Sequence, residues 1–200
     1  MELRIAIPTD FSPAAEKAAR YTLELFRDVP CVFFLMHSYT PSFFRAEYLL
    51  HSPGQGPEKT IRQLDAGFFL ENMRCNALPS LLLARHLQAR FRHGRPAVFA
   101  AISAKVGSIE DNRLGGWFSY RASKSALNMC LKTLSLEWAR TLPNVSVAAL
   151  HPGTTDTELS RPFQKNVPSW QLFEPARTAG YLLDVIESLT PAQTGYFLAF

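Results

Sequence analysis

Glycine is absent from the first quarter of the chain, since the first of its ten glycines is Gly54. A site that holds a diphosphate through backbone amides needs a glycine-rich turn after a leading strand. Only glycine lets the backbone come close to the phosphates at a helix N-terminus. No Gly-x-Gly-x-x-Gly pattern occurs anywhere in the 200 residues. The sequence therefore predicts that a diphosphate cradle of this kind is missing.

Cysteine and long apolar runs are also scarce. Cys31, Cys75 and Cys130 lie far apart and form no Cys-x-x-Cys pair. This argues against a disulfide framework or a zinc site and favours a reducing, cytoplasmic compartment. No apolar run approaches the roughly 20 residues that span a membrane, so we expect neither a transmembrane segment nor a secretory leader. The histidines show no metal-ligand spacing, and no metal site is expected.

The composition is that of a folded domain with a mild positive charge. Hydrophobic residues make up 47% of the chain and charged residues 19%, which excludes disorder and low complexity. The 21 lysines and arginines exceed the 17 acidic residues to give a net charge of +4, but they are scattered. We therefore expect neither nucleic acid nor a membrane surface as a partner.

Five short apolar runs alternate with helical segments. The runs show little polar alternation, as in strands that are covered on both faces of a parallel sheet. They lie at 4–8, 31–37, 97–102, 145–150 and 195–200, with helices expected at 13–26, 58–92 (kinked by Pro79), 120–140 and 175–189. This alternation predicts one three-layer, doubly wound α/β domain over residues 1–200, flavodoxin-like or Rossmann-like. Right-handed crossovers favour strand order 2-1-3-4-5.

Residues from about 57 to 200 resemble the short-chain dehydrogenase/reductase family. Ala-Ile-Ser-Ala-Lys-Val-Gly-Ser at 101–108 matches its serine-bearing strand end, and Tyr-Arg-Ala-Ser-Lys at 120–124 matches its Tyr-x-x-x-Lys motif. His-Pro-Gly at 151–153 matches its Pro-Gly turn, and Asn76 stands where the family keeps an asparagine. Asp-Asn-Arg-Leu-Gly-Gly-Trp at 111–117 is most similar to the C-factor-type subgroup.

The resemblance implies a catalytic tyrosine, lysine and serine. Tyr120 would exchange a proton with the substrate while a nicotinamide cofactor carries the hydride. Lys124, one helical turn away, would favour the phenolate. The family usually has two serines where this chain has Ser103 and Ala104, so the catalytic serine could be Ser103, could be Ser108, or could be lost.

The resemblance also implies roles for residues around this motif. Asn76 would shape a helix bend and a proton path, the alternative being a helix-surface amide. Pro152 and Gly153 would form a turn at the cofactor, and Thr154 and Thr157 would touch its nicotinamide end. The alternative for the two threonines is ordinary use in a loop and a helix cap.

Residues 1 to about 54 resemble a second family, the universal stress proteins. Ile-Ala-Ile-Pro-Thr-Asp-Phe-Ser-Pro at 5–13 is similar to the opening strand and helix of that family, and Phe-Leu-Met-His at 34–37 is similar to its second strand. The resemblance places Asp10 near a nucleotide, the alternative being a carboxylate favoured at a helix entry. The glycine-containing phosphate loop of that family is missing.

Two family signatures without either phosphate loop predict an engineered chimera, made of segments 1–55 and 56–200 and joined within 52–57. We expect this scaffold for fold recombination to have no native enzymatic function and no cofactor. The alternatives are an NAD(P)-dependent short-chain oxidoreductase that uses Ser103, Tyr120 and Lys124, and an ATP-binding stress-type module. A homodimer is expected through helices 58–92 and 120–140, whose apolar patch would comprise Phe68, Phe69, Leu82, Trp117, Phe118 and Met129.

Overall fold

The computed structural model describes residues 3–8, 31–36, 56–157 and 159–199. Contacts within the chain divide it into two compact units, Met1–Tyr48 and Leu49–Phe200. In the first unit β1 (Leu3–Pro8) pairs in parallel with β2 (Cys31–Met36), with Leu3 opposite Cys31. The helix expected at 13–26 lies outside the described residues.

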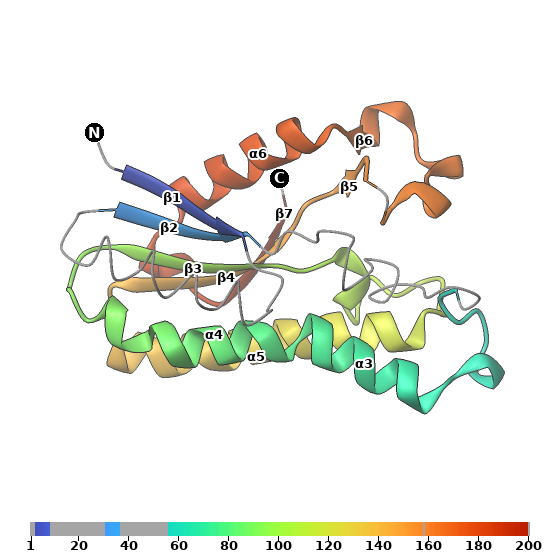
Figure 1. Cartoon of the computed structure of the whole chain (residues 1–200), viewed down its shortest axis with the longest axis horizontal. Helices are drawn as coiled ribbons and strands as arrows, with labels where there is room; N and C mark the ends of the chain where they lie inside the picture. Colours follow the sequence, from blue (N-terminus) through green and yellow to red (C-terminus); the bar gives the residue numbers. More distant parts are fainter. Residues whose placement is uncertain (1–2, 9–30, 37–55, 158, 200) are drawn as a thin grey trace. The chain divides into compact units, whose positions relative to one another are not determined.

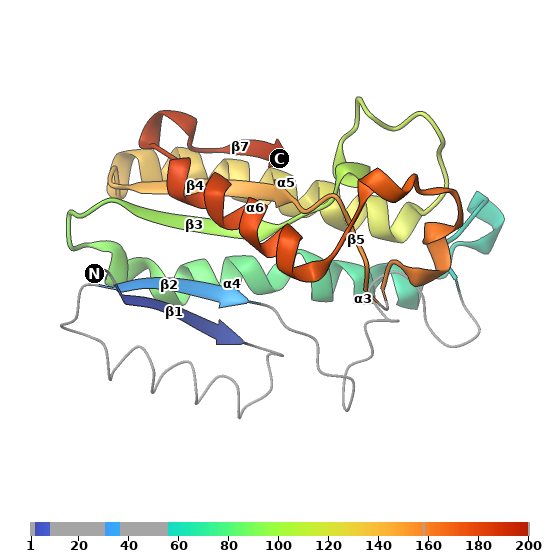
Figure 2. The same ribbon diagram turned by 90° about the horizontal axis from the view of Figure 1, so that it is seen from above.

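The second unit is built on a parallel sheet with the strand order β3-β4-β7. These strands are β3 (Ala97–Ile102), β4 (Val145–His151) and β7 (Tyr196–Ala199). In the central strand β4 every residue from 145 to 150 is buried, which explains its unbroken apolar pattern. Figures 1 and 2 show α4 (Leu78–Leu87) and α5 (Phe118–Thr141) on one face of this sheet and α6 (Pro175–Ser188) on the other.

The predicted layers are confirmed, but the complete five-strand order is not. Strands 1 and 2 of the prediction are neighbours, and strands 3, 4 and 5 follow one another as β3, β4 and β7. The remaining neighbours, strands 1 and 3, would join the two units. That pairing, and with it a single domain over residues 1–200, stays a prediction.

The prediction of one long helix over 58–92 is wrong, because the segment forms two shorter helices. The segment forms α3 (Ala66–Asn76) and α4 (Leu78–Leu87), with short 3-10 turns before and after them. Asp65 starts α3, because its carboxylate accepts a hydrogen bond from the Phe68 amide at 2.7 Å. The helices break at Ala77, and Pro79 lies in the first turn of α4, where its missing N–H is not needed.

The other two predicted helices agree with the structure within two residues at each end. They are α5 (Phe118–Thr141) and α6 (Pro175–Ser188). The core lies between α5 and the sheet, where the fully buried Trp138 contacts Phe91 and Phe99 at centroid distances of 5.4 and 5.5 Å. Among the described residues, no helix combines the length and the apolar character that crossing a membrane requires.

The apolar patch expected on the surface is only partly exposed. Phe68 is 7% exposed and belongs to the interior, so its place in that patch was wrong. The reason is that α3 turns Phe68, together with Asn72 and Asn76, toward the protein interior. Leu82 on α4 and Met129 on α5 are exposed as expected.

Candidate active site

Tyr120 and Lys124 lie together on α5, one turn apart. The Lys124 ammonium nitrogen is 5.7 Å from the centroid of the Tyr120 ring. The same Nζ donates a hydrogen bond of 3.2 Å to the carbonyl oxygen of Ile102, the last residue of β3. The expected tyrosine and lysine therefore share one helix face at the carboxyl end of the sheet, where open α/β proteins bind their ligands.

Burial sets the protonation of both groups. It raises the pKa of Tyr120 to about 12 and lowers the pKa of Lys124 to about 8. The cause is the loss of solvent, which disfavours the charged form of each group. That Lys124 favours the phenolate stays a prediction. Near neutral pH Tyr120 is a neutral phenol with a proton to give, and Lys124 is mostly an ammonium ion.

The turn after β3 is fixed against α5. This turn, η3 (Lys105–Gly107), approaches so closely that a Cβ on Gly107 would lie 2.8 Å from the backbone carbon of Lys124. The Ser125 hydroxyl donates to the Gly107 carbonyl at 2.8 Å, and Arg121 Nη1 donates to the Val106 carbonyl at 3.3 Å. These contacts hold Lys124 and the end of β3 in a defined arrangement.

Both candidate serines have hydrogen-bond partners within the fold. Ser103 is 2% exposed, and its hydroxyl donates to Asn128 Oδ1 on α5 at 2.6 Å. The Ser108 hydroxyl accepts from the Asp111 amide at 3.3 Å and closes a turn. Ala104 follows Ser103 in extended backbone, before η3, and carries no hydroxyl. A catalytic role for either serine stays a prediction.

Asn76 connects the break between the helices to α5. It is the last residue of α3, and its Nδ2 donates to the Ser123 hydroxyl at 2.9 Å and to Asn72 Oδ1 at 3.3 Å. Ser123 in turn donates to the carbonyl oxygen of Tyr120 at 2.8 Å. Asn76 is thus a buried link to the Tyr-x-x-x-Lys turn, and the reading as a surface amide is wrong.

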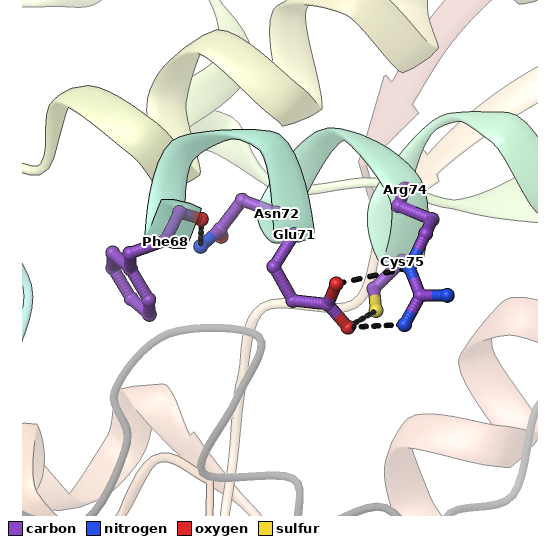
Figure 3. Close-up of polar contacts among 5 residues, drawn as sticks. All are labelled: Phe68, Glu71, Asn72, Arg74 and Cys75. Atoms are coloured by element: carbon purple, nitrogen blue, oxygen red, sulfur yellow. Dashed lines mark hydrogen bonds and ion pairs between the residues drawn. The ribbon is translucent and has the colours of Figure 1, made fainter. Parts of the chain in front are cut away.

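A second set of contacts on α3 stays within that helix. The Glu71 carboxylate accepts two hydrogen bonds of 2.9 Å from Arg74 and one of 3.2 Å from the Cys75 thiol (Figure 3). Burial, followed by the hydrogen bond to Glu71, raises the pKa of Cys75 to about 12. This thiol is therefore not a thiolate at neutral pH and is no candidate nucleophile.

The Pro-Gly turn leads from β4 into a short parallel pair, β5 (Thr154–Thr155) and β6 (Leu172–Phe173). Gly153 has a φ of 64°, a conformation that favours glycine. Thr154 is half-buried in β5. The Thr157 amide donates to the Ser160 hydroxyl at 3.3 Å. Contact of these threonines with a cofactor stays a prediction, and Asp10 lies outside the described residues.

Tyr120 is the first of three aromatic rings that lie in a row, each beside the next. The Trp117 ring is 6.4 Å from that of Tyr120 and 4.9 Å from that of Phe163 in η4 (Arg161–Asn166), centroid to centroid. From the sequence, Trp117 was expected in the dimer patch and at the end of the C-factor-like segment 111–117, and Phe163 was not identified. The sequence feature that could have identified Phe163 was its position in the segment that follows the Pro-Gly turn.

Residues 40–168 match the family model of the short chain dehydrogenases. A 1-hydroxy-2-glutathionyl-2-methyl-3-butene dehydrogenase from Rhodococcus sp. (strain AD45) is 31% identical over 137 residues, which cover 68% of this chain and 58% of that enzyme. The C-signal protein of Myxococcus xanthus is 32% identical over 125 residues, 62% of this chain and 70% of that protein. The chain thus spans less than two thirds of the Rhodococcus relative.

Solved structures of reductases share the fold. The NADPH-bound carbonyl reductase from chicken fatty liver has a TM-score of 0.70 at 23% identity, over 94% of this chain and 71% of that one. A 4-hydroxyisoleucine dehydrogenase mutant complexed with NADH and succinate has a TM-score of 0.65 at 18% identity, over 96% of this chain and 75% of that one. At these identities the likeness shows the Rossmann-like α/β fold.

These findings correct the main prediction from the sequence. An engineered chimera without enzymatic function is wrong, because the chain matches a dehydrogenase family and dehydrogenase relatives over most of its length. The match starts at residue 40, before the junction expected within 52–57, and nothing supports a universal stress protein segment. The expectation of no cofactor is likewise unsupported. The chain belongs to the short-chain dehydrogenase family.

Proposed function

We propose that the chain is an oxidoreductase that interconverts a carbonyl compound and its alcohol with a nicotinamide coenzyme. The observation that carries this proposal is the pair of Tyr120 and Lys124 on α5, with Lys124 bonded to the end of β3. The family membership supports the same reaction class. Cys75 and Cys130 are free thiols, which favours a cytoplasmic location for it.

NADPH or NADH is the coenzyme class that the related structures support, since their descriptions name both. The donor set in the described residues suits the nicotinamide end. Lys124 offers an ammonium group at the end of β3, and Thr154 and Thr157 follow the Gly153 turn at the end of β4. When bound, the coenzyme supplies the hydride. A glycine-rich turn for the diphosphate would be expected directly after the first strand, and residues 9–30, which follow that strand, lie outside the described residues.

Tyr120 acts in carbonyl reduction as the proton donor. Its raised pKa of about 12 keeps the phenol protonated throughout the neutral range. As negative charge develops on the substrate oxygen, the phenol gives its proton to that oxygen and becomes a phenolate. The Lys124 ammonium, held one turn away by the Ile102 carbonyl, stabilises the phenolate that remains.

The surroundings of Tyr120 favour a substrate with an apolar or aromatic substituent. The Trp117 ring, just before α5, lies beside the phenol ring, and the Phe163 ring, from the segment after the Pro-Gly turn, lies beside Trp117. Aromatic faces of this kind bind flat apolar groups through burial and ring contacts. We therefore propose aromatic aldehydes and ketones as the substrate class.

The test is the oxidation of NADPH in the presence of 4-nitrobenzaldehyde, followed by absorbance. Tyr120→Phe removes the proton donor and keeps the ring, so we expect kcat to fall by roughly 10² to 10⁴. Tyr181→Phe is the matched control, because Tyr181 lies on α6 and accepts a 2.7 Å hydrogen bond from Arg177. Equal rates for the parent chain and Tyr120→Phe would refute the proposal.

A further inference from the structure

Glu58 is a buried acidic residue that lies outside the Tyr-x-x-x-Lys motif. Glu58 lies in the segment before η1 (Ile61–Gln63), and the residue is only 2% exposed. A carboxylate removed from water to this extent requires hydrogen-bond donors in the protein, because an unpaired buried charge is strongly unfavourable. The identity of these donors indicates what the residue does.

The donors come from the first turn of α5, 61 residues further along the chain. The Ser119 amide donates to both carboxylate oxygens of Glu58 at 3.3 Å, and the Ser119 hydroxyl donates to Oε1. The backbone carbonyl of Glu58 also accepts a hydrogen bond from the Trp117 amide. Trp117 at the N-cap and Ser119 in the first turn of α5 are thereby tied to one residue, directly before Tyr120.

The start of α5 has no cap of its own. Trp117, its N-cap residue, is left-handed with a φ of 54° and makes no side-chain capping bond, and the first turn contains no acidic residue. The preceding Gly116 also has a positive φ, of 64°, and a Cβ there would lie 3.1 Å from the Glu58 carbonyl oxygen. The segment at Glu58 therefore supplies the cap and the negative charge that a helix N-terminus favours.

We propose that Glu58 is a positioning residue for Tyr120, because its carboxylate caps the first turn of α5 and fixes the orientation of the phenol. This inference rests on the proposed function, in which Tyr120 is the proton donor. A phenol displaced by even a fraction of an ångström meets the substrate oxygen less often in a reactive geometry. The groups proposed for the coenzyme, Lys124 further along α5 and the threonines after β4, lie outside this turn.

The kinetic test uses Glu58→Gln and Ser119→Ala, with NADPH and 4-nitrobenzaldehyde. Each variant should lower kcat by about tenfold while the KM for NADPH changes by less than about twofold. The double variant should lose no more than either single variant, because the two residues act as one unit. Glu71→Gln is the matched control, since that carboxylate bonds only within α3 among the contacts shown in Figure 3, and it should keep the parent kcat. Parent-like kcat in Glu58→Gln and Ser119→Ala would overturn the proposal.

A second measurement separates this proposal from the proposed function. In Glu58→Gln the Ser119 amide should exchange with deuterium at least about tenfold faster, while Leu131 in the core of the same helix keeps its rate. If the parent chain shows no turnover, the proposed function fails and this exchange result alone decides whether Glu58 holds the turn. An unchanged Ser119 rate would show that Glu58 does not.

Discussion

The protonation of Tyr120 and Lys124 is set by burial in the first two turns of α5. The pKa of the phenol is raised to about 12 and that of the ammonium is lowered to about 8, both because the charged forms lose solvent. The spacing of the motif predicts which groups meet. Their pKa values depend on how deeply the fold buries them, and the motif alone does not predict that burial.

The first prediction at this scale concerns pH. Lys124 loses its proton as pH rises through about 8, and the phenolate left after proton transfer then loses its stabilising charge. The kcat of reduction should therefore be constant below pH 7 and fall above pH 8, while Tyr120 stays protonated. The check is a pH profile from 6 to 10 in which Lys124→Arg, which keeps its charge, shows no such fall. A flat parent profile would contradict the assignment.

Ala104 offers a second prediction at the residue scale. The Ser103 hydroxyl donates its hydrogen bond to Asn128. The next residue, Ala104, has no hydroxyl to offer a substrate. Ala104 has extended backbone, with φ −148° and ψ 146°, which accepts serine without strain. Ala104→Ser should raise kcat on the order of tenfold, since one donor to a developing oxyanion has an effect of at least that size. A lower or unchanged kcat would show that the added hydroxyl does not reach the substrate.

The residues of the site differ in how well the sequence predicts them. Tyr120 and Lys124 are four positions apart on one helix, so local spacing is enough to pair them. Glu58 and Phe163 reach the same helix across long stretches of chain, and no local pattern indicates such contacts. Sequence reasoning therefore predicted that Tyr120 and Lys124 meet, and it missed the contacts of Glu58 and Phe163 at the start of α5.

At the scale of elements, the packing of η3 against α5 is the contact most sensitive to volume. Gly107→Ala would place a Cβ 2.8 Å from the Lys124 backbone and must push the two elements apart. We expect the free energy of unfolding to fall by about 1–3 kcal/mol. A Cβ on Gly180 in α6 would meet no atom within 4 Å, so Gly180→Ala should raise the free energy of unfolding by about 0.4–1 kcal/mol. Urea unfolding of both variants checks the contrast, which would fail if Gly107→Ala were as stable as the parent.

Element boundaries show where the periodic pattern is sufficient. The predicted ends of α5 and α6 hold within two residues, because each helix has apolar residues at helical spacing along its whole length. The segment 58–92 has a continuous helical pattern, yet Asp65 starts one helix and Ala77 ends it. The break depends on the Asn76 contact with Ser123 in α5, which a reading of α3 alone does not reveal.

At the scale of the whole molecule, we propose a homodimer through α4 and α5. Apolar side chains remain exposed on both helices: Leu78 45%, Leu82 44%, Met129 66% and Leu136 56%. Side chains seven apart on α5 and four apart on α4 lie on common helix faces, which suits a two-helix contact. Met129→Glu should reduce the mass in light scattering from dimer to monomer, whereas Ile109→Glu, in an exposed loop, should not. A monomeric parent would contradict this proposal.

The whole molecule is also where sequence reasoning failed. The missing glycine turn and the Pro-Thr-Asp-Phe-Ser-Pro segment at 8–13 predicted an inactive hybrid. The family match begins at residue 40 and runs through the expected junction. A short motif near one end is weak evidence, because few residues carry it and many folds begin with a strand and a helix.

The most direct test of the central claim is the transfer of deuterium from NADPH labelled at C4 of the nicotinamide to 4-nitrobenzaldehyde. We expect mass spectrometry to find the label in the alcohol formed by the parent chain and by Tyr181→Phe, and only traces with Tyr120→Phe. Unlabelled alcohol, or equal labelling with and without the Tyr120 hydroxyl, would contradict the assignment of Tyr120 and Lys124 as a working oxidoreductase pair.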